Sequence, residues 1–381
     1  MTEREHRYLA ITELFLPTKG GTAIWFSEVF KYLGGKGIHI VTADVPGAAE
    51  VDAGHPNTIH RLNLRRVWWQ RPESLGIYAR LFFVSLWLAV TRRFEAIHAI
   101  RSLPEGLVAW AVARLTFRPV IVYAHGEELT GWGRGAKYKA MCFTLRHANK
   151  VVANSDNTRD ELLRMGVNPE KITIIYPGVD VHCFRQDLPF DDLHQSLGLS
   201  EGQKLVLSVG RLSRRKGFDT VIRCLPQLLQ QGLDIQYVLI GIGEDHDYLK
   251  ELATELGVSE RVHLLGHVSP DDLPRWYNAC DVFAMPNRDI NGDTEGFGMV
   301  FMESAACGKP SIAGMAGGTG NAVIDGATGL RVDGERLEDV AVAIERLMTD
   351  REYASRLGRQ GYARAVADFS WEAVAGKTAL L

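Results

Sequence analysis

The sequence predicts an α/β protein with two doubly wound domains, each built on a parallel sheet. Short runs rich in β-branched residues alternate with amphipathic helical segments along most of the 381 residues, a pattern typical of parallel sheets covered by helices on both faces. The alternation pauses over residues 177–202, which are rich in Pro, Gly, Asp and Ser, so we place the junction between domains 1–180 and 181–360 there. Ligands of doubly wound sheets bind at the carboxyl ends of strands, which predicts a site in a cleft between the two domains.

Seven strands are expected before the junction and six after it, because each is a β-branched or aromatic run bounded by turn residues. The first seven are Leu9–Phe15, Ile38–Ala43, Ile59–Leu64, Ala96–Ile100, Val120–Tyr123, Lys150–Ala153 and Ile172–Tyr176. The other six are Leu205–Val209, Gln236–Ile240, Val262–Leu265, Val282–Met285, Pro310–Ile312 and Gly329–Val332. The expected helices include Phe218–Gln231, Asp247–Leu256 and Leu337–Met348.

Composition excludes several protein classes. Hydrophobic residues make up 46% of the chain and charged residues 23%, which argues against a disordered chain or a collagen. The five cysteines include no C-x-x-C pair, so neither a zinc site nor a disulfide framework is expected, and a reducing compartment suits them. The first residues are charged and then strand-like, so no secretory signal is expected. The most apolar later run, Leu81–Val90, is half as long as a membrane span of about 20 residues.

Charge is distributed unevenly along the chain. Residues 1–180 carry 23 Lys and Arg against 17 Asp and Glu, whereas the remainder carries 20 against 29. A basic N-terminal half would suit an anionic surface, although chance variation in surface charge explains the difference equally well. Arginines with interfacial aromatics within residues 61–93 suit a membrane with anionic lipids, and a core helix with solvated arginines is an equal alternative. The arginines and aromatics in question are Arg65, Arg66, Trp68, Trp69, Arg71, Arg80, Phe82, Phe83, Trp87, Arg92 and Arg93. No nucleic-acid recognition motif appears.

The strongest chemical signal is EGFGMVFMESAACGKPSIAG, residues 295–314. The predicted helix starts two residues after Glu295, and Glu303 lies two turns inside it. Gly296 and Gly298 leave backbone N–H groups bare at the helix start, where these groups and the helix dipole bind anions. One carboxylate could hold a sugar hydroxyl and the other a ribose diol. The alternative is an ordinary helix start with a favourable acid.

The second signal is SVGRLSRRKGFDTVI, residues 208–222, which follows the first strand of the C-terminal domain and opens a helix. Arg211 and Lys216 lie five apart across this turn. Arginine offers a planar fork to phosphate oxygens and lysine a mobile point charge, so together they suit a diphosphate. Arg214 and Arg215 add two further cations in an acidic domain. A merely solvated turn is the alternative.

Two weaker signals lie in the N-terminal domain. Gly20 and Gly21 follow the first strand and would let a ligand approach the backbone closely, although a glycine turn is common at this place. His125 ends a buried strand and would face the cleft, although without context a satisfied core histidine is the better interpretation. In the C-terminal domain, residues 245–247 imitate a metal-binding D-x-D, and residues 241–243 imitate a dinucleotide fingerprint without its third glycine. We expect neither a metal nor a nicotinamide cofactor.

Together these motifs resemble glycosyltransferase family 4, the retaining enzymes of the GT-B fold. The resemblance covers nearly the whole chain, through NSDNTRDEL, IYPGVD, VGRLSRRKG, LIGIGED, VHLLGHV, EGFGMVFMES and AGG. It implies two Rossmann-like domains facing across a cleft and a C-terminal helix, 361–381, that crosses back to the N-terminal domain. Because of the extended NRDINGDTEGFG loop, the chain resembles bacterial phosphatidylinositol mannosyltransferases and exopolysaccharide glycosyltransferases.

The resemblance also implies residue roles. Arg211 and Lys216 would hold the nucleotide diphosphate and offset charge on the leaving group. Glu303 would bind the ribose hydroxyls and Glu295 the donor sugar, and His125 would reach the transferred sugar. Other donor contacts are implied for Gly20, Gly21, His267, Val268, Gly296, Phe297, Gly298, Met299 and Val300. The chain departs from the family at Asn321, which replaces the acid of GG-x-x-E, at Pro286-Asn287, where Pro-Ser is usual, and in a short tail.

The implied activity is retaining transfer of a hexose from a nucleotide diphosphate sugar to a lipid or lipid-linked glycan, without a catalytic metal or a resident cofactor. GDP-mannose is the first expectation for the donor, and UDP-sugars come next. We expect a cytoplasmic protein, peripheral on the inner face of the membrane. The alternatives are a nucleotide-sugar epimerase of the same fold and a non-catalytic sugar-nucleotide-binding protein. A sugar phosphorylase would need a cofactor lysine for which no motif is seen.

Overall fold

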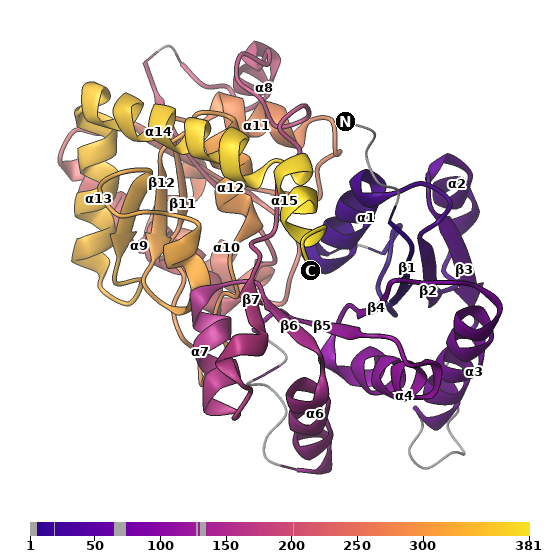
Figure 1. Cartoon of the computed structure of the whole chain (residues 1–381). Coiled ribbons are helices and arrows are strands. Elements are labelled where there is room, and N and C mark those ends of the chain that lie inside the picture. Colours follow the sequence, from indigo (N-terminus) through magenta and orange to yellow (C-terminus); the bar gives the residue numbers. More distant parts are fainter. Residues whose placement is uncertain (1–5, 19, 65–73, 127–128, 130–134, 201) are drawn as a thin grey trace. The chain divides into compact units, whose positions relative to one another are not determined.

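The structure, a computed structural model, describes residues 6–18, 20–64, 74–126, 129, 135–200 and 202–381 (Figure 1). The chain forms two compact units: the N-terminal unit, Met1–Pro177 with Trp371–Leu381, and the C-terminal unit, Gly178–Ser370. The boundary thus lies three residues before the expected one at residue 180.

The expected single C-terminal helix is in fact two helices. Helix α14 (Arg351–Phe369) stays with the C-terminal unit, and only α15 (Trp371–Thr378) belongs to the N-terminal unit, where it packs on α1 (Gly21–Leu33). The break falls where the backbone N–H of Val179 donates to the carbonyl of Phe369 over 2.7 Å.

The N-terminal unit contains a parallel sheet of seven strands in the order β3-β2-β1-β4-β5-β6-β7. Chain order reverses between β1 and β4, and a doubly wound sheet binds its ligands at such a point. The strands are β1 (Tyr8–Ile11), β2 (His39–Ala43), β3 (Thr58–Leu62), β4 (Ala96–Ala99), β5 (Val120–Ala124), β6 (Lys150–Ala153) and β7 (Ile172–Ile174).

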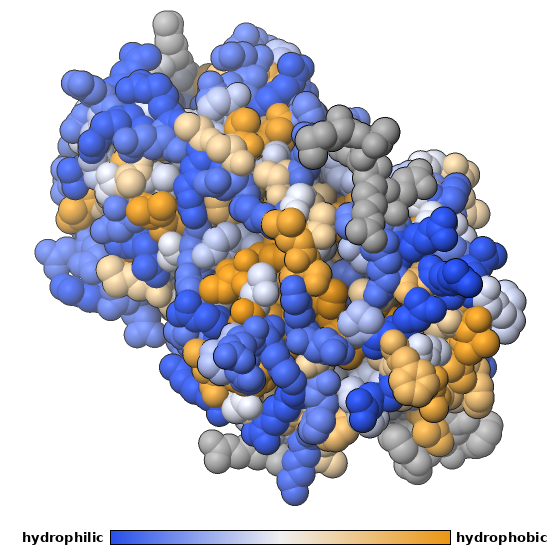
Figure 2. All heavy atoms as spheres, viewed as in Figure 1, coloured by the Kyte–Doolittle hydropathy of each residue, from blue (hydrophilic) through white to orange (hydrophobic). Residues whose placement is uncertain are grey.

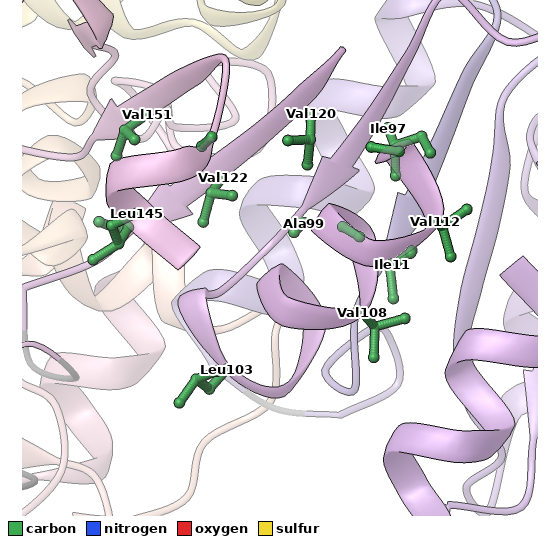
Figure 3. Close-up of a cluster of buried hydrophobic side chains, with 14 of the residues drawn as sticks. Ile11, Ile97, Ala99, Leu103, Val108, Val112, Val120, Val122, Leu145 and Val151 are labelled. Atoms are coloured by element: carbon green, nitrogen blue, oxygen red, sulfur yellow. The ribbon is translucent and has the colours of Figure 1, made fainter. Parts of the chain in front are cut away.

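Alternate side chains of these strands pack on different helices. Ile97 and Val122 face α3 (Leu75–Thr91) and α4 (Leu107–Thr116) in a large apolar core, where Figure 3 shows them pointing toward the helix that carries Val108. Aromatic and histidine side chains of the other face, such as Tyr123, pack against α1. The remaining helices of the unit are α2 (Ala48–Gly54), α3 (Leu75–Thr91), α4 (Leu107–Thr116), α6 (Ala136–His147) and α7 (Asp156–Arg164), with short helices at Ser102–Gly106 and Pro169–Lys171.

The C-terminal unit contains a parallel sheet of six strands in the order β10-β9-β8-β11-β12-β13. The strands are β8 (Lys204–Val209), β9 (Ile235–Ile240), β10 (Val262–Gly266), β11 (Val282–Met285), β12 (Ser311–Gly314) and β13 (Gly329–Val332). The helices are α8 (Asp191–Ser196), α9 (Phe218–Gln230), α10 (His246–Glu255), α11 (Leu273–Ala279), α12 (Met299–Ala306), α13 (Leu337–Thr349) and α14, with short helices at Arg214–Lys216, Ser259–Arg261 and Gly317–Asn321.

All thirteen expected strands are present, and two element boundaries differ in an instructive way. Strand β1 ends at Ile11 instead of Phe15, because the chain turns at Thr12, whose hydroxyl donates to the carbonyl of Leu14 over 2.9 Å. Helix α12 begins at Met299 instead of residue 297, because Gly298 has a left-handed φ of 88°. Within the part of the chain that the structure describes, no helix combines the length and apolar character needed to cross a membrane.

Candidate active site

The candidate residues of the C-terminal unit lie in loops that leave the carboxyl edge of its sheet. The turn after β8 and the loop after β11 are neighbours because these two strands pair. Gly217, at the end of the β8 turn, has a φ of 74°, and a Cβ there would lie 2.0 Å from the carbonyl oxygen of Pro286. Only glycine permits this approach. The two segments are therefore fixed in backbone contact.

The carboxylate of Glu295 is the electrostatic centre of this edge. Its Oε2 accepts from Lys216 Nζ and, over 2.8 Å, from Arg215 Nη1. The side chains of Lys216 and Glu295 are each only 10% exposed. Burial alone would raise the pKa of Glu295, but Lys216 and Arg215 together hold it below its ordinary value. The site therefore contains a buried carboxylate that stays ionised.

The four cations of the β8 turn do not act on one point. Lys216 and Arg215 point inward to Glu295, whereas Arg211 is 72% exposed and pairs with Glu244 over 3.1 Å. Arg214 pairs with an aspartate of the next loop over 3.1 Å and lies 3.4 Å from the ring centre of a tyrosine on α10. Joint binding of a diphosphate by Arg211 and Lys216 stays a prediction, because among the described residues Arg211 pairs with Glu244 and Lys216 with Glu295.

Helix α12 places the second carboxylate. Phe297 and Gly296 are buried just before it, and Met299 and Val300 are half-buried in its first turn. The Glu303 carboxylate accepts a hydrogen bond from the Tyr277 hydroxyl over 2.7 Å. Burial raises the pKa of Glu303 to about 7, against the lowering effect of this hydrogen bond. The two glutamates therefore differ: one is held ionised, and the other titrates near neutrality.

The remaining candidates of this unit lie around the same edge. His267 is exposed directly after β10, and Val268 beside it is half-buried. The GGTGN segment lies against the site, since the N–H of Gly318 donates to the carbonyl of Glu295 over 2.8 Å. Asn321, which replaces the family acid, uses its own carbonyl to accept from an arginine of α14. In the described ranges, no three or more His, Cys, Asp or Glu side chains gather where they could hold a metal ion.

The N-terminal unit carries its own polar cluster at the carboxyl edge of its sheet. Gly20, with a φ of 142°, directly precedes Gly21 at the start of α1, and a Cβ on Gly20 would meet no heavy atom within 4 Å. His125 follows β5, and its Nε2 donates to the carbonyl of Ile100 over 2.8 Å. Burial, helped by nearby Arg101, lowers the pKa of His125 to about 4, against the raising effect of its hydrogen bond to Ile100. The imidazole is therefore neutral at physiological pH, with Nδ1 left as the acceptor.

Two family profiles match the chain in sequence. One described as "Glycosyltransferase Family 4" covers residues 19–182, and one described as "Glycosyl transferases group 1" covers residues 189–364. The chain is also 30% identical to the Mycobacterium tuberculosis protein named GDP-mannose-dependent alpha-(1-6)-phosphatidylinositol monomannoside mannosyltransferase, over 98% of this chain and 97% of that one. The chain belongs to glycosyltransferase family 4. A Rhodococcus opacus D-inositol 3-phosphate glycosyltransferase is 34% identical over 59% of this glycosyltransferase and 51% of its own length.

Solved structures agree with this assignment at the level of the fold. HepE from Anabaena, solved in complex with UDP, superposes with a TM-score of 0.82 at 22% identity, over 98% of both chains. Sucrose-phosphate synthase from Thermosynechococcus elongatus gives a TM-score of 0.77 at 22% identity, over 98% of both chains. The expected GT-B fold and the expected glycosyltransferase activity are confirmed.

Sequence reasoning missed several polar residues of this glycosyltransferase. Tyr277 gives no signal, because it lies on an otherwise ordinary short helix. Arg215 was visible only as one cation of four. In the N-terminal unit, Arg101 binds both Glu13 over 2.8 Å and the fully buried Glu105 over 2.9 Å. A signal existed for Arg101, since a charged residue directly after the apolar run Ala96–Ile100 indicates a polar sheet edge.

Proposed function

We propose that this glycosyltransferase moves a hexose, with mannose favoured, from a nucleoside diphosphate sugar to a lipid or lipid-linked glycan acceptor, with retention of configuration. The observation that carries the proposal is the buried Glu295 with its two cations, in the loop that leads to the bare start of α12. Such a site offers positive charge to a diphosphate and a carboxylate to sugar hydroxyls. The name of the mycobacterial relative favours GDP-mannose, and UDP-sugars are the next candidates.

The proposed mechanism depends on the negative charge that develops on the departing phosphate. The acceptor hydroxyl attacks the anomeric carbon on the face from which the phosphate departs. A new C–O bond forms, the bond to the phosphate oxygen breaks with its electron pair, and the leaving phosphate takes the hydroxyl proton. Arg211, Lys216 and the N–H groups at Gly298 would stabilise the negative leaving group, and such preorganised electrostatics is commonly the largest contribution to catalysis. The proposed reaction uses no metal and no resident cofactor.

The other site residues would orient the donor. The Glu303 carboxylate would accept hydrogen bonds from the ribose hydroxyls, and the Glu295 carboxylate would accept hydrogen bonds from hydroxyls of the sugar. His267 and Val268 would contact the base. Backbone groups at residues 296–300 would approach the sugar and phosphates. From the N-terminal unit, Gly20 and Gly21 would lie near the diphosphate, and His125 would reach the transferred sugar through its free Nδ1.

The surface of α3 and α4 supports a lipid acceptor. Helix α3 buries one apolar stripe, yet its opposite stripe, Phe83, Trp87 and Val90, is exposed. Phe117, at the end of α4, is 95% exposed. Figure 2 shows apolar residues gathered over the part of the surface that α3 and α4 occupy in Figure 1. A helix that is apolar all round needs a second apolar environment.

Cations border this surface. Arg80, Arg92, Arg93 and Arg114 are exposed on α3 and α4 or directly after α3. Arginines around exposed aromatics match a membrane surface with anionic lipids. Phe82, also predicted for this surface, is instead half-buried and packs against the apolar core of the unit. The other predicted residues, Arg65, Arg66, Trp68, Trp69 and Arg71, lie outside the described residues. We propose that the glycosyltransferase is cytoplasmic and meets the inner face of the membrane here.

Donor binding is tested by thermal shift with GDP, UDP, ADP and their common sugars. A ligand that binds only the native state raises stability by mass action. We expect a shift with one base, lost in Arg211→Ala/Lys216→Ala and kept in Arg214→Ala, whose side chain is engaged with its own partners. Transfer of labelled sugar from that donor into a lipid extract then tests the reaction. No shift with any nucleotide, with or without lipid acceptor, would contradict the proposal.

The membrane surface is tested by flotation with vesicles of phosphatidylcholine and phosphatidylglycerol at low salt. We expect wild-type protein to float, and Phe83→Ser/Trp87→Ser to stay at the bottom of the gradient. Val342→Ser removes an equally exposed apolar side chain from α13 and should float like wild type. Flotation that is equal in all three proteins, or absent in all three, would contradict this surface.

A further inference from the structure

Glu295 carries two cations on one carboxylate oxygen, and the proposed function accounts for only one of them. Lys216 is assigned to the diphosphate, whereas Arg215 has no such assignment. The Arg215 side chain is only 14% exposed, and its Nη1 lies 2.8 Å from Glu295 Oε2. Its Nε lies 3.4 Å from Asp293, two residues before Glu295. Arg215 therefore spans two acids of the extended loop.

The same loop is fastened to the β8 turn at a second point. The backbone N–H of Arg288 donates to the carbonyl of Arg215 over 2.8 Å. The Arg288 guanidinium then reaches α9, where it donates to both carboxylate oxygens of Asp219 over 2.9 Å and to the Thr220 hydroxyl over 3.1 Å. The backbone of Arg215 is thus fixed by Arg288, which in turn is bonded to α9. This restricts where the Arg215 side chain can reach.

The buried Glu295 carboxylate needs a counter-ion to stay ionised. A buried carboxylate without a counter-ion takes up a proton, because burial disfavours the charged form. If Lys216 turns toward a bound diphosphate, Glu295 loses one of its two partners. Arginine is the better of the two for a fixed pair, because its planar fork is preorganised and always charged.

We propose that Arg215 is a positioning residue, which keeps the Glu295 carboxylate ionised and aimed at the donor sugar while Lys216 neutralises the diphosphate. This inference rests on the proposed function for the identity of the ligand. Its structural part concerns Glu295 alone. Among the described residues, the charged groups at the Glu295 carboxylate are Lys216 and Arg215 from the β8 turn. Asp293 of its own loop contacts Arg215, and from the short helix after β12, Gly318 contributes a backbone N–H to the Glu295 carbonyl.

The test compares Arg215→Met and Arg215→Lys with Arg214→Met as the matched control. Arg214 is the neighbouring arginine, but instead of Glu295 it contacts an aspartate of the next loop and a tyrosine of α10. We measure by calorimetry the affinity for the nucleotide alone and for the nucleotide sugar, and kcat across pH. Arg215→Met should keep the nucleotide affinity, lose the additional affinity that the sugar gives, and lower kcat about tenfold or more. Its acidic limb of kcat should move to higher pH, Arg215→Lys should recover part of each loss, and Arg214→Met should match wild type.

Two outcomes would overturn the inference. One is an Arg215→Met protein that behaves as Arg214→Met does. The other is an equal loss of affinity for the nucleotide and the nucleotide sugar, which would make Arg215 a phosphate ligand. If wild type binds no nucleotide sugar, the proposed function fails. The claim that Arg215 keeps Glu295 ionised is then tested by a measurement that needs no ligand.

That measurement is the pH dependence of thermal unfolding. Because the pKa of folded Glu295 lies below that of the unfolded chain, its ionised form stabilises the fold above the unfolded pKa of about 4.5, and this stability is lost as pH falls through the folded pKa. Arg215→Met should weaken this dependence when Glu295 is present. In a Glu295→Gln background the same substitution should leave the pH dependence of unfolding unchanged. Arg214→Met should leave it unchanged. An unchanged dependence in Arg215→Met would overturn the inference even without a ligand.

Discussion

The pKa of Glu303 gives a direct test of the nucleotide site. The folded carboxyl has a pKa of about 7, and only its ionised form can accept hydrogen bonds from both ribose hydroxyls. Binding should therefore release a proton below pH 7, and affinity should rise with pH. One pH unit below that pKa, about one carboxyl in eleven is ionised, and one unit above it about ten in eleven. Affinity should consequently be about tenfold higher at pH 8 than at pH 6.

The assay is calorimetry with the nucleotide sugar instead of the free nucleotide. A terminal phosphate has a second pKa of about 6 and would itself titrate in this range, whereas both phosphates of a nucleotide sugar are esterified. Glu303→Gln should bind with no pH dependence between pH 6 and 8. Tyr277→Phe removes the 2.7 Å hydrogen bond that lowers the Glu303 pKa, so the rise in affinity should move to higher pH. The assignment is refuted if wild type binds equally at pH 6 and 8, or if Glu303→Gln keeps the wild-type dependence.

Unfolding gives the same pKa without a ligand. Between pH 4.5 and 7 the folded carboxyl holds a proton that the unfolded chain has lost, so the free energy of unfolding falls as pH rises through this window. The fall is at most about 3–4 kcal/mol, since each pH unit of pKa difference is worth about 1.4 kcal/mol. In urea denaturation, wild type should have a lower free energy of unfolding at pH 8 than at pH 5. Glu303→Gln should lack this contribution to the pH dependence.

Three further predictions follow from single contacts. Gly298→Ala should lower the free energy of unfolding by about 1–3 kcal/mol, because its φ is 88° and a Cβ would lie 2.6 Å from the Phe301 ring; Gly54→Ala, with nothing within 4 Å, is the control in urea denaturation. His125→Ala should lower kcat about tenfold without changing calorimetric nucleotide affinity; a loss of nucleotide affinity would contradict its sugar role. Glu244→Gln frees Arg211 from an exposed pair, so nucleotide affinity should rise about two- to fivefold at low salt and converge with wild type at high salt.

The fold was predictable because buried parallel strands are continuous apolar runs, which few other structures require. Errors arose where an apolar run continues past its strand. Phe15 is fully buried, but it reaches the core from the turn after β1 and packs edge-on against His55. The hydrophobicity of Phe15 predicts that the side chain is buried, but it does not indicate whether the residue lies on a strand or in a loop.

The sequence names candidate residues for the site, but it does not indicate which of them contact one another. Glu295 and Lys216 are 79 positions apart, and only the pairing of β8 with β11 brings their segments together. The sequence SRRKG also cannot say which arginine turns inward, since Arg214 and Arg215 are chemically identical neighbours. The direction of each side chain is set by the short helix at Arg214–Lys216 and by Arg288, whose N–H fixes the Arg215 carbonyl.

Because the cations of this edge are paired with acids, the proposed diphosphate binding would be an exchange of partners. Arg211 and Lys216 would each leave an acid to meet a phosphate, so their contribution to affinity would be the difference between two ion pairs. For exposed Arg211 that difference is small and sensitive to salt, because water and ions compensate its freed partner. For Lys216 the partner is Glu295, whose side chain is only 10% exposed and so is poorly compensated by solvent. The exchange is then favourable only if another cation stays with the carboxylate. The second arginine of the turn meets this requirement, and the same pair that keeps Glu295 ionised in the free protein would keep it ionised with the donor bound.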